Sequence, residues 1–474
     1  MKSRAVMLAA LLIAALAIVT VWGLFFLSAR RTSGPIRHEA YVWQRVWTGP
    51  VREAVVQHGT NFAALAMLKA EVSWKEKKPQ VVRVPLDYGA LSNLHRPFAL
   101  ALRIGPYAGP FLPVSTPSSH ATQSPASSPS PPTREERAGE RRPTSGQPNT
   151  PLPGPLPAAQ GEGITDFLCD LAAAIVAEAR TNHAVLSELQ IDFDCAESKL
   201  DGYRVWLTAI QQRVAPLPVT ITALPSWLDA RAFKRLATVA TNYVLQVHSV
   251  ERPKDVNAPF TLCDPRTAER WVDTAGRIGV PFRVALPTDG YVIAFDKTGK
   301  FIGLSAEGPR RTWPEGARTR EIFTDPLVMA ELVEGWKTSR PEALRGVIWY
   351  RLPTRVDNFN WRWPTLGAIV ASRSLQEKLR IEPRRVEAGL VEIKLVNSGE
   401  LDISSRLAVE VRWSDARLMA GDALRDFELA DRSASAARFQ TKTNSIRLPA
   451  GDFLTLGWLR FDRDCEVRCE LKKL

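Results

Sequence analysis

One short segment, Leu-Gln-Ile-Asp-Phe-Asp-Cys-Ala-Glu at residues 189–197, supports an inference about the whole fold. Apolar and polar side chains alternate along its first half, which predicts a β-strand with one apolar face. The other face carries Asp192 and Asp194, and Glu197 follows just past the strand. Helical sequence, including Gly202–Leu207, comes next. Acidic side chains at the end of a strand that leads into a helix are typical of the catalytic rim of a (β/α)8 barrel.

The alternation of strand-like and helical segments extends over most of the chain. Eight segments read as strands separated by helices, near residues 41, 66, 99, 190, 219, 244, 282 and 347. Parallel strands joined by crossover helices predict a (β/α)8 barrel over residues 38–380, that is, an α/β fold of the TIM type. A doubly wound open sheet is the alternative. That fold usually has a glycine-rich phosphate loop after its first strand, and Thr48-Gly49-Pro50 is no such loop.

Other segments depart from this alternation. Residues 115–161 are dominated by Pro, Ser, Thr and Gly, a composition that buries too little surface to offset chain entropy, so we predict a disordered insertion. A hairpin is expected from Tyr291–Phe295 and Phe301–Leu304. The last barrel helix is expected at Pro364–Leu379. Strand-like segments without helical crossovers then predict an antiparallel β-sandwich over residues 382–474.

The N-terminus predicts membrane attachment. Lys2 and Arg4 precede an uncharged apolar run, Ala5–Leu27, and Arg30-Arg31 follow it. The run is long enough to cross a bilayer as a helix and longer than most signal-peptide cores. We therefore expect residues 1–31 to be a retained signal anchor in the inner (cytoplasmic) membrane, with the folded part exported to the periplasm or the cell exterior. A cleaved signal peptide is the alternative.

Composition argues against several function classes. The net charge is +12 and the isoelectric point about 9.6, yet the basic residues are scattered and form no stripe with interleaved aromatic residues. We therefore expect no nucleic-acid partner. The five cysteines form no Cys-x-x-Cys pair and no cluster with histidines, so neither a metal site nor a cofactor is expected. Motifs of serine hydrolases and zincins are missing from the sequence. The oligomeric state stays open.

In a barrel, the residues at the carboxyl ends of the strands converge on one rim. Carboxylates beside aromatic rings suit sugars, because ring faces stack on pyranose faces while carboxyls cleave glycosidic bonds. The candidate catalytic residues are Asp192, Asp194, Glu71 and His248, and the candidate substrate-binding residues are Gln44, Trp349, Tyr350 and Arg351. Asp192 and Asp194 lie about 6–7 Å apart along the strand. Simpler interpretations are a helix cap and solvated carboxylates for the acids, and a structural role for His248.

Three segments carry a family resemblance: Tyr41–Arg45, Leu189–Asp194 and Gly346–Pro353. Together they resemble an uncharacterised bacterial family, the domain-of-unknown-function 3142 family. The resemblance spans residues 38–375 apart from the low-complexity insertion, and it implies no activity, because none is assigned to the family.

A more distant resemblance concerns the strand at Asp192. It is similar to the fourth barrel strand of family-18 chitinase-like glycoside hydrolases, whose pattern is Asp-x-Asp-x-Glu with the glutamate as acid. Here the matching position is Ala196, and Glu197 lies one residue later. On a strand, a shift of one residue turns a side chain to the opposite face.

These observations favour an exported, membrane-anchored, glycoside-hydrolase-like barrel protein that acts on or binds envelope or extracellular glycans. A glycan and the membrane are then its expected partners. The alternative is a non-catalytic saccharide-binding or envelope scaffold protein. The rim acids favour an enzyme and Ala196 favours the scaffold, so whether the chain is a glycoside hydrolase stays open.

Overall fold

The computed structural model describes residues 30–75, 78–107, 109–111, 163–249, 252–306, 312–443 and 446–473. The predicted membrane helix, Ala5–Leu27, and the predicted insertion at residues 115–161 lie outside the described residues. Within the described ranges, no helix combines the length and the apolar character that a bilayer crossing needs.

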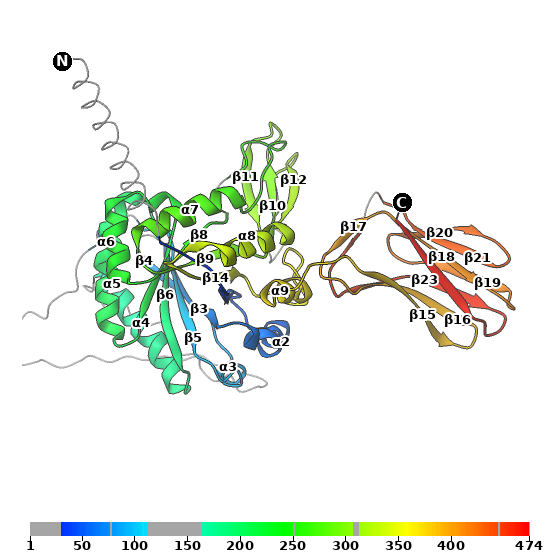
Figure 1. Ribbon diagram of the computed structural model, residues 1–474, viewed down its shortest axis with the longest axis horizontal. Helices are drawn as coiled ribbons and strands as arrows, with labels where there is room; N and C mark the ends of the chain where they lie inside the picture. Colours follow the sequence, from blue (N-terminus) through cyan, green and yellow to red (C-terminus); the bar gives the residue numbers. More distant parts are fainter. Residues whose placement is uncertain are drawn as a thin grey trace, which may run out of the picture.

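The described residues contain a closed barrel of eight parallel strands (Figure 1). Neighbouring strands follow the order β2, β14, β9, β8, β7, β6, β5, β3, and the pairing of β2 with β3 closes the ring. Their bounds are Arg37–Val42 (β2), Ala64–Lys75 (β3), Phe98–Ile104 (β5), Leu186–Phe193 (β6), Val219–Ala223 (β7), Tyr243–Gln246 (β8), Phe282–Pro287 (β9) and Leu344–Tyr350 (β14). The predicted (β/α)8 barrel is confirmed, and the segment at Asp192 is its fourth strand in chain order.

Helices follow the strands and cover the outside of the barrel (Figure 1). They are α2 (Gly49–His58), α3 (Tyr88–Ser92), α4 (Ile164–Thr181), α5 (Leu200–Val214), α6 (Arg231–Ala240), α7 (Pro265–Ile278), α8 (Pro326–Thr338) and α9 (Trp363–Val370), with 3-10 turns at Gly59–Asn61, Glu197–Lys199 and Pro225–Trp227. The prediction for the last helix was wrong at its end. Ser372 adopts a φ of 55°, in the left-handed region, so α9 stops at Val370 instead of Leu379.

The apolar faces of the strands pack outward, against the helices. Ile191 and Phe193 on β6 belong to this outer core, where the Phe193 ring lies 5.2 Å from the Trp206 ring of α5. The barrel interior has its own small cluster, built of Tyr41, Ala66, Ala99, Val244, Ala285 and Ile348. Because half of these inward side chains are alanines, they leave space in the barrel above them.

A three-stranded sheet interrupts the barrel after β9 and projects from it (Figure 1). Its strands are β10 (Gly290–Phe295), β11 (Phe301–Ser305) and β12 (Arg318–Phe323), with β10 in the middle. A two-stranded hairpin was predicted, so β12 is a correction. Three of its six residues, Arg-Thr-Arg-Glu-Ile-Phe, are charged and all six are at least partly exposed, so the segment lacks the apolar alternation by which strands are recognised.

Two four-stranded antiparallel sheets follow the barrel and share one apolar core. Such a pair of sheets is a β-sandwich. The first sheet contains β15 (Leu379–Glu387), β16 (Leu390–Asn397), β23 (Phe453–Phe461) and β19 (Leu418–Ala423), and the second β20 (Phe427–Arg432), β21 (Ala436–Thr441), β18 (Leu407–Trp413) and β24 (Val467–Lys473). Smaller pairings are β17 (Ile403–Ser405) with β22 (Ile446–Leu448), β1 (Arg31–Thr32) with β13 (Arg340–Pro341), and β4 (Lys78–Arg83) on β3. The boundary expected at residue 382 falls inside β15.

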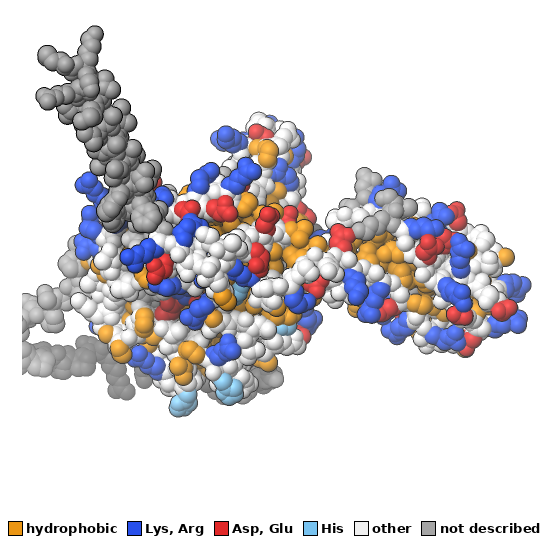
Figure 2. Space-filling view, in the orientation of Figure 1, with side chains coloured by type: hydrophobic (Ala, Val, Ile, Leu, Met, Phe, Trp, Pro, Cys, Tyr) orange, Lys and Arg blue, Asp and Glu red, His pale blue; other side chains and the backbone are white. Residues whose placement is uncertain are grey.

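Basic and acidic side chains are interspersed on the face of the molecule in Figure 2, over barrel and sandwich alike. Many form ion pairs. On the sandwich, Glu410 forms ion pairs with Arg412 at 2.7 Å and with Lys472 at 3.0 Å. The basic side chains on this face therefore have acidic side chains between them.

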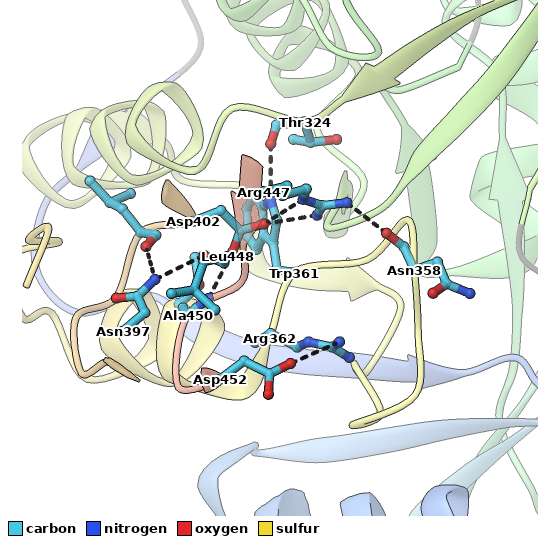
Figure 3. Close-up of polar contacts among 12 residues, drawn as sticks. Thr324, Asn358, Trp361, Arg362, Asn397, Asp402, Arg447, Leu448, Ala450 and Asp452 are labelled. Atoms are coloured by element: carbon cyan, nitrogen blue, oxygen red, sulfur yellow. Dashed lines mark hydrogen bonds and ion pairs between the residues drawn. The ribbon is translucent and has the colours of Figure 1, made fainter. Parts of the chain in front are cut away.

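Arg447 of β22 joins the sandwich to the barrel (Figure 3). Its guanidinium donates to Oδ2 of Asp402, at 2.8 and 3.0 Å, and to the carbonyl oxygen of Asn358 in the loop after β14, at 2.7 Å. It also lies 4.0 Å from the ring centre of Phe323 on β12. Figure 3 shows a second contact nearby, in which Arg362 approaches Asp452 at 3.7 Å. One side chain thus connects three parts of the chain.

Replacing Arg447 by alanine is expected to weaken the attachment of the sandwich. The change removes hydrogen bonds from a charged group and a cation–π contact, together worth roughly 1–3 kcal/mol at a partly exposed site. In scanning calorimetry, unfolding of the sandwich should shift to lower temperature and separate from that of the barrel. Arg412→Ala, which removes an arginine from β18 of the sandwich without touching the barrel, should leave the transitions joined. Equal effects of both variants would contradict this role of Arg447.

Candidate functional site

A cavity of about 170 Å³ opens inside the barrel at the carboxyl ends of the strands. Its floor includes Tyr41, Val244 and Ala285 of the interior cluster. Small-molecule sites usually measure roughly 300–1,000 Å³, so this cavity has room for one small unit of a ligand. The active sites of TIM barrels lie at this end of the fold.

Two carboxylates from one strand enter the cavity. Along β6 the side chains of Glu188, Gln190 and Asp192 alternate with the outward apolar residues and point inward, and Asp194 continues the row. Asp192 is buried; its Oδ1 accepts a hydrogen bond from Thr222 at 2.8 Å, and its Oδ2 lies 3.8 Å from Nε of Arg103. Asp194 is exposed at the cavity.

The surroundings disfavour the ionised form of both carboxyls. Desolvation raises the pKa of Asp192, against the attraction of Arg103 and the hydrogen bond from Thr222. Desolvation and the charge of Asp192 raise the pKa of Asp194 to about 6, against the attraction of Arg103. Because the two groups repel each other when ionised, ionisation of one raises the pKa of the other, so the two carboxyls titrate as a pair.

Replacing Asp192 by asparagine is expected to lower the pKa of Asp194. The variant removes one of the two causes that raise this pKa, the neighbouring negative charge, and leaves Arg103 in place. Side-chain carboxyl ¹³C shifts followed over pH would measure it. A pKa of Asp194 that stays near 6 in Asp192→Asn would mean that the two carboxyls do not interact.

Aromatic rings form one wall of the cavity. The ring of Tyr350, at the end of β14, is stacked on His248 with 5.4 Å between centroids. Trp43 meets Tyr350 edge to face at 5.8 Å and Tyr41 at 5.1 Å. All four side chains line the cavity. Rings and carboxylates therefore face the same space.

His248 is uncharged at neutral pH. Burial lowers its pKa to about 4. Its Nδ1 lies 3.2 Å from Oγ of Ser249, which in turn lies 3.3 Å from the hydroxyl of Tyr291 on β10. Burial also raises the pKa of the Tyr291 phenol, which stays protonated. This part of the wall offers hydrogen bonds without net charge.

A charged layer supports the cavity from below. Arg283 of β9 donates to Glu39 of β2 and to Glu188 of β6, both at 2.6 Å, and all three side chains are buried. Gln190 donates to Glu188 at 2.6 Å and accepts from the hydroxyl of Tyr41 at 2.9 Å. A continuous chain of hydrogen bonds thus runs from the ion cluster to a side chain in the cavity floor.

Another cavity, of about 200 Å³, lies where α2, α9 and the sandwich meet. Its charged side chains are already paired: Arg355 with Glu53 at 2.8 Å, and Arg362 with Asp452 at 3.7 Å. The cavity in the barrel instead holds carboxyls with perturbed pKa values, which is the more typical feature of a functional site. We therefore place the candidate site in the barrel.

Residues 152–355 match the model of a domain of unknown function, DUF3142. This confirms the predicted resemblance, although the match includes Leu189–Asp194 and Gly346–Pro353 and leaves out Tyr41–Arg45. No curated protein matches the chain.

Several solved structures are similar to this chain at low sequence identity. Chitinase ChiA74 from Bacillus thuringiensis is 9% identical over 92% of this chain and 100% of its own, with a TM-score of 0.40. The spore cortex-lytic enzyme SleL from Bacillus cereus is 10% identical over 73% and 76%, with a TM-score of 0.44. A chitinase from Chromobacterium violaceum is 14% identical over 72% and 100%, with a TM-score of 0.42.

Four of the residues predicted from sequence meet in the cavity: Asp192, Asp194, His248 and Tyr350. All four lie within the DUF3142 match. Glu71 does not line the cavity. It is paired with Arg45 and lies next to Arg103 in the register of β3 and β5. Gln44, Trp349 and Arg351 also lie outside the lining.

Neighbouring interactions explain where the last two residues lie. Trp349 is fully buried in the outer core, where its Nε1 donates to Nδ1 of His38 at 3.1 Å. Arg351 is buried and pairs with Asp357 at 3.2 Å. Neither side chain has a surface that faces the cavity.

Sequence reasoning assigned no role to the other nine lining residues, which include Trp43, Arg103, Thr222 and Tyr291. Arg103 lies one residue before the end of β5, and Thr222 lies one residue before the end of β7, in which Thr220 and Thr222 alternate with apolar residues. Tyr291 belongs to the inserted sheet, to which no rule about barrel strand ends applies. Trp43 lies outside the DUF3142 match, one residue beyond β2. Among the described residues, no three His, Cys, Asp or Glu side chains gather as a metal site would require.

Proposed function

We propose that this protein binds a glycan, one sugar unit of which occupies the cavity in the barrel. The observation that carries the proposal is the combination of an exposed carboxylate, Asp194, with the rings of Trp43 and Tyr350 in one cavity. Aromatic faces stack on the apolar faces of sugars, and carboxylates accept hydrogen bonds from sugar hydroxyls. The volume of about 170 Å³ suits a single ring of a longer chain.

We further propose that the glycan belongs to the cell envelope or the exterior. This rests on the apolar run Ala5–Leu27 with its flanking basic residues, which supports a retained signal anchor in the cytoplasmic membrane. The barrel would then be exported and stay close to the membrane. We expect the full-length protein in the membrane fraction. Added protease should digest it only after the cell layers outside the cytoplasmic membrane have been made permeable.

Hydrolysis of the glycan is the second candidate function, favoured by one observation. The pKa of Asp194 is raised to about 6, so this carboxyl is a usable proton donor near neutral pH. Asp192 would then be the second carboxyl that glycosidases need. Against this stands the position two residues after Asp194, where Ala196 replaces the glutamate of family-18 enzymes, and Glu197 does not line the cavity.

A panel of envelope and extracellular glycans tests both functions. The full-length protein, kept in mild detergent, would be assayed for binding by calorimetry and for turnover by product analysis, beside Asp194→Asn. Binding without turnover supports the proposal, and turnover that falls as pH rises above about 6 supports the second candidate, because Asp194 then loses its proton. Absence of binding to any glycan would overturn both.

The Asp194→Asn variant is expected to fold. Because folding raises the pKa of Asp194, the ionised carboxyl opposes folding at pH values above about 6, and this cost disappears as the group is protonated at lower pH. The neutral amide avoids the cost, so the variant should be at least as stable as the wild type at pH 7. Glu197→Gln, which removes an exposed carboxylate outside the cavity, is the matched control.

A further inference from the structure

The charges that line the cavity do not balance. Among the lining side chains, Asp192 and Asp194 are acidic and Arg103 is the basic group, while His248 is neutral because burial lowers its pKa to about 4. With both carboxyls ionised, the lining carries one more negative than positive charge. A ligand with one positive charge would restore neutrality in a space where water is partly excluded.

The imbalance is localised on Asp194. Asp192 accepts a hydrogen bond from Thr222 at 2.8 Å and forms an ion pair with Arg103 at 3.8 Å. Across the described ranges of the chain, neither a hydrogen bond nor an ion pair reaches the Asp194 carboxylate, although it is exposed to the cavity. Hydrogen bonds to an ionised group are the stronger class, so this carboxylate, which lacks a donor among the described residues, gains from any donor that a ligand brings.

The wall beside this carboxylate suits a cation as well. Tyr350 and Trp43 present ring surfaces to the cavity, and the negative face of an aromatic ring attracts ammonium groups within about 6 Å of its centre. The same rings accept the apolar face of a pyranose. A sugar that carries a free amine combines both properties in one unit.

We propose that the sugar unit bound in the cavity is an amino sugar with a free amino group, and that Asp194 pairs with its ammonium. The inference rests on the proposed glycan-binding function and narrows it to de-N-acetylated glycans. An N-acetyl group would replace the charge with a neutral amide and add bulk in a cavity of about 170 Å³. A neutral sugar would leave the negative charge uncompensated.

The pH dependence of binding distinguishes this role from proton donation. The titratable and charged groups around Asp194 are Glu71 on β3, Arg103 on β5, Asp192 on β6, Cys195 and Lys199 after β6, Tyr203 on α5, His248 after β8, Tyr291 on β10 and Tyr350 on β14. Cation binding needs ionised Asp194, so affinity should rise as pH increases through about 6. It should fall again only when the sugar amine loses its proton, above roughly pH 7.7.

Calorimetry with four trisaccharides tests the inference. Three share a β-1,4 backbone and consist of glucosamine, N-acetylglucosamine or glucose; the fourth is the β-1,6-linked trimer of glucosamine. With the full-length protein near pH 7, a glucosamine trimer should bind at least about tenfold tighter than the other two sugars, as expected for a charge-assisted contact. Asp194→Asn should remove this preference, and Glu197→Gln should keep it.

The other outcomes are separable. Equal or tighter binding of the acetylated or the neutral trimer would overturn the amino-sugar inference and leave glycan binding intact. A glucosamine preference that survives in Asp194→Asn would overturn the assignment of Asp194. If none of the trimers binds and the wider glycan panel is also negative, the proposed function fails together with the inference. If the panel contains a ligand without free amines, only the inference fails.

Discussion

Replacing Arg283 by methionine is expected to lower the free energy of unfolding by about 3–5 kcal/mol, because it leaves two buried carboxylates without their cation. Arg283 lies between Glu39 and Glu188 inside the barrel, within 2.6 Å of each. Burial opposes ionisation of Glu188, but the charge of Arg283 and hydrogen bonds from Thr220 and Gln190 outweigh it and hold the pKa of Glu188 below its usual range. Urea unfolding followed by circular dichroism would measure the loss.

Glu39 is the less compensated partner in this cluster. Burial raises its pKa in spite of the attraction of Arg283. Removing the charges together should therefore recover most of the stability: we expect the triple variant Arg283→Met, Glu39→Gln, Glu188→Gln to unfold at a higher urea concentration than Arg283→Met alone. If Arg283→Met unfolds like the wild type, the cluster does not support the barrel as described.

Replacing Tyr350 by alanine should reduce glycan affinity by at least about thirtyfold, the usual effect of removing a central aromatic contact. The Tyr350 ring lies against His248, Trp43 and Tyr41, so its loss opens the wall on which a sugar would stack. Calorimetry with the tightest glycan of the panel would measure the change.

Tyr350→Phe keeps the aromatic ring and removes only the hydroxyl, so it is the control for the effect of Tyr350→Ala on glycan affinity. It should bind within about threefold of the wild type. Because loss of a large buried ring costs about 3–5 kcal/mol of stability and Tyr350 is partly buried, the melting temperature of Tyr350→Ala must be recorded beside its affinity. Wild-type affinity in a folded Tyr350→Ala protein would place the glycan elsewhere.

The alternation in residues 189–197 was enough to predict the fourth barrel strand and its acidic face. The pattern does not predict which face of the strand points into the barrel and which points to the helices. Apolar Ile191 and Phe193 point outward to the helices, and polar Gln190 and Asp192 point into the barrel, where small alanines on other strands make room for them. That room depends on seven other strands, which no local pattern describes.

Adjacent residues at a strand end illustrate why the site was only half predicted. Trp349, Tyr350 and Arg351 were all expected to bind substrate, yet successive side chains on a strand point to opposite faces. Tyr350 enters the cavity, Trp349 packs in the outer core and Arg351 pairs with Asp357. A one-residue difference in the register of β14 would reverse this, and register is fixed by pairing with β9 and β2.

Glu71 shows the same dependence on register. The sequence suggested a strand that ends there, whereas β3 continues to Lys75 because β4 pairs with it. An irregularity in the pairing of β3 with β5, between Leu68 and Ala70, precedes Glu71. The glutamate pairs with Arg45 instead of facing the cavity.

The central claim is that Asp192, Asp194 and the rings around them form the glycan site. Its most direct test is calorimetry of the full-length protein with the tightest glycan of the panel, comparing the wild type with the double variant Asp192→Asn, Asp194→Asn. Because hydrogen bonds that involve charged groups are the stronger class, we expect the folded double variant to lose at least about hundredfold in affinity, and Glu197→Gln to lose none. Unchanged affinity in the double variant would contradict the account.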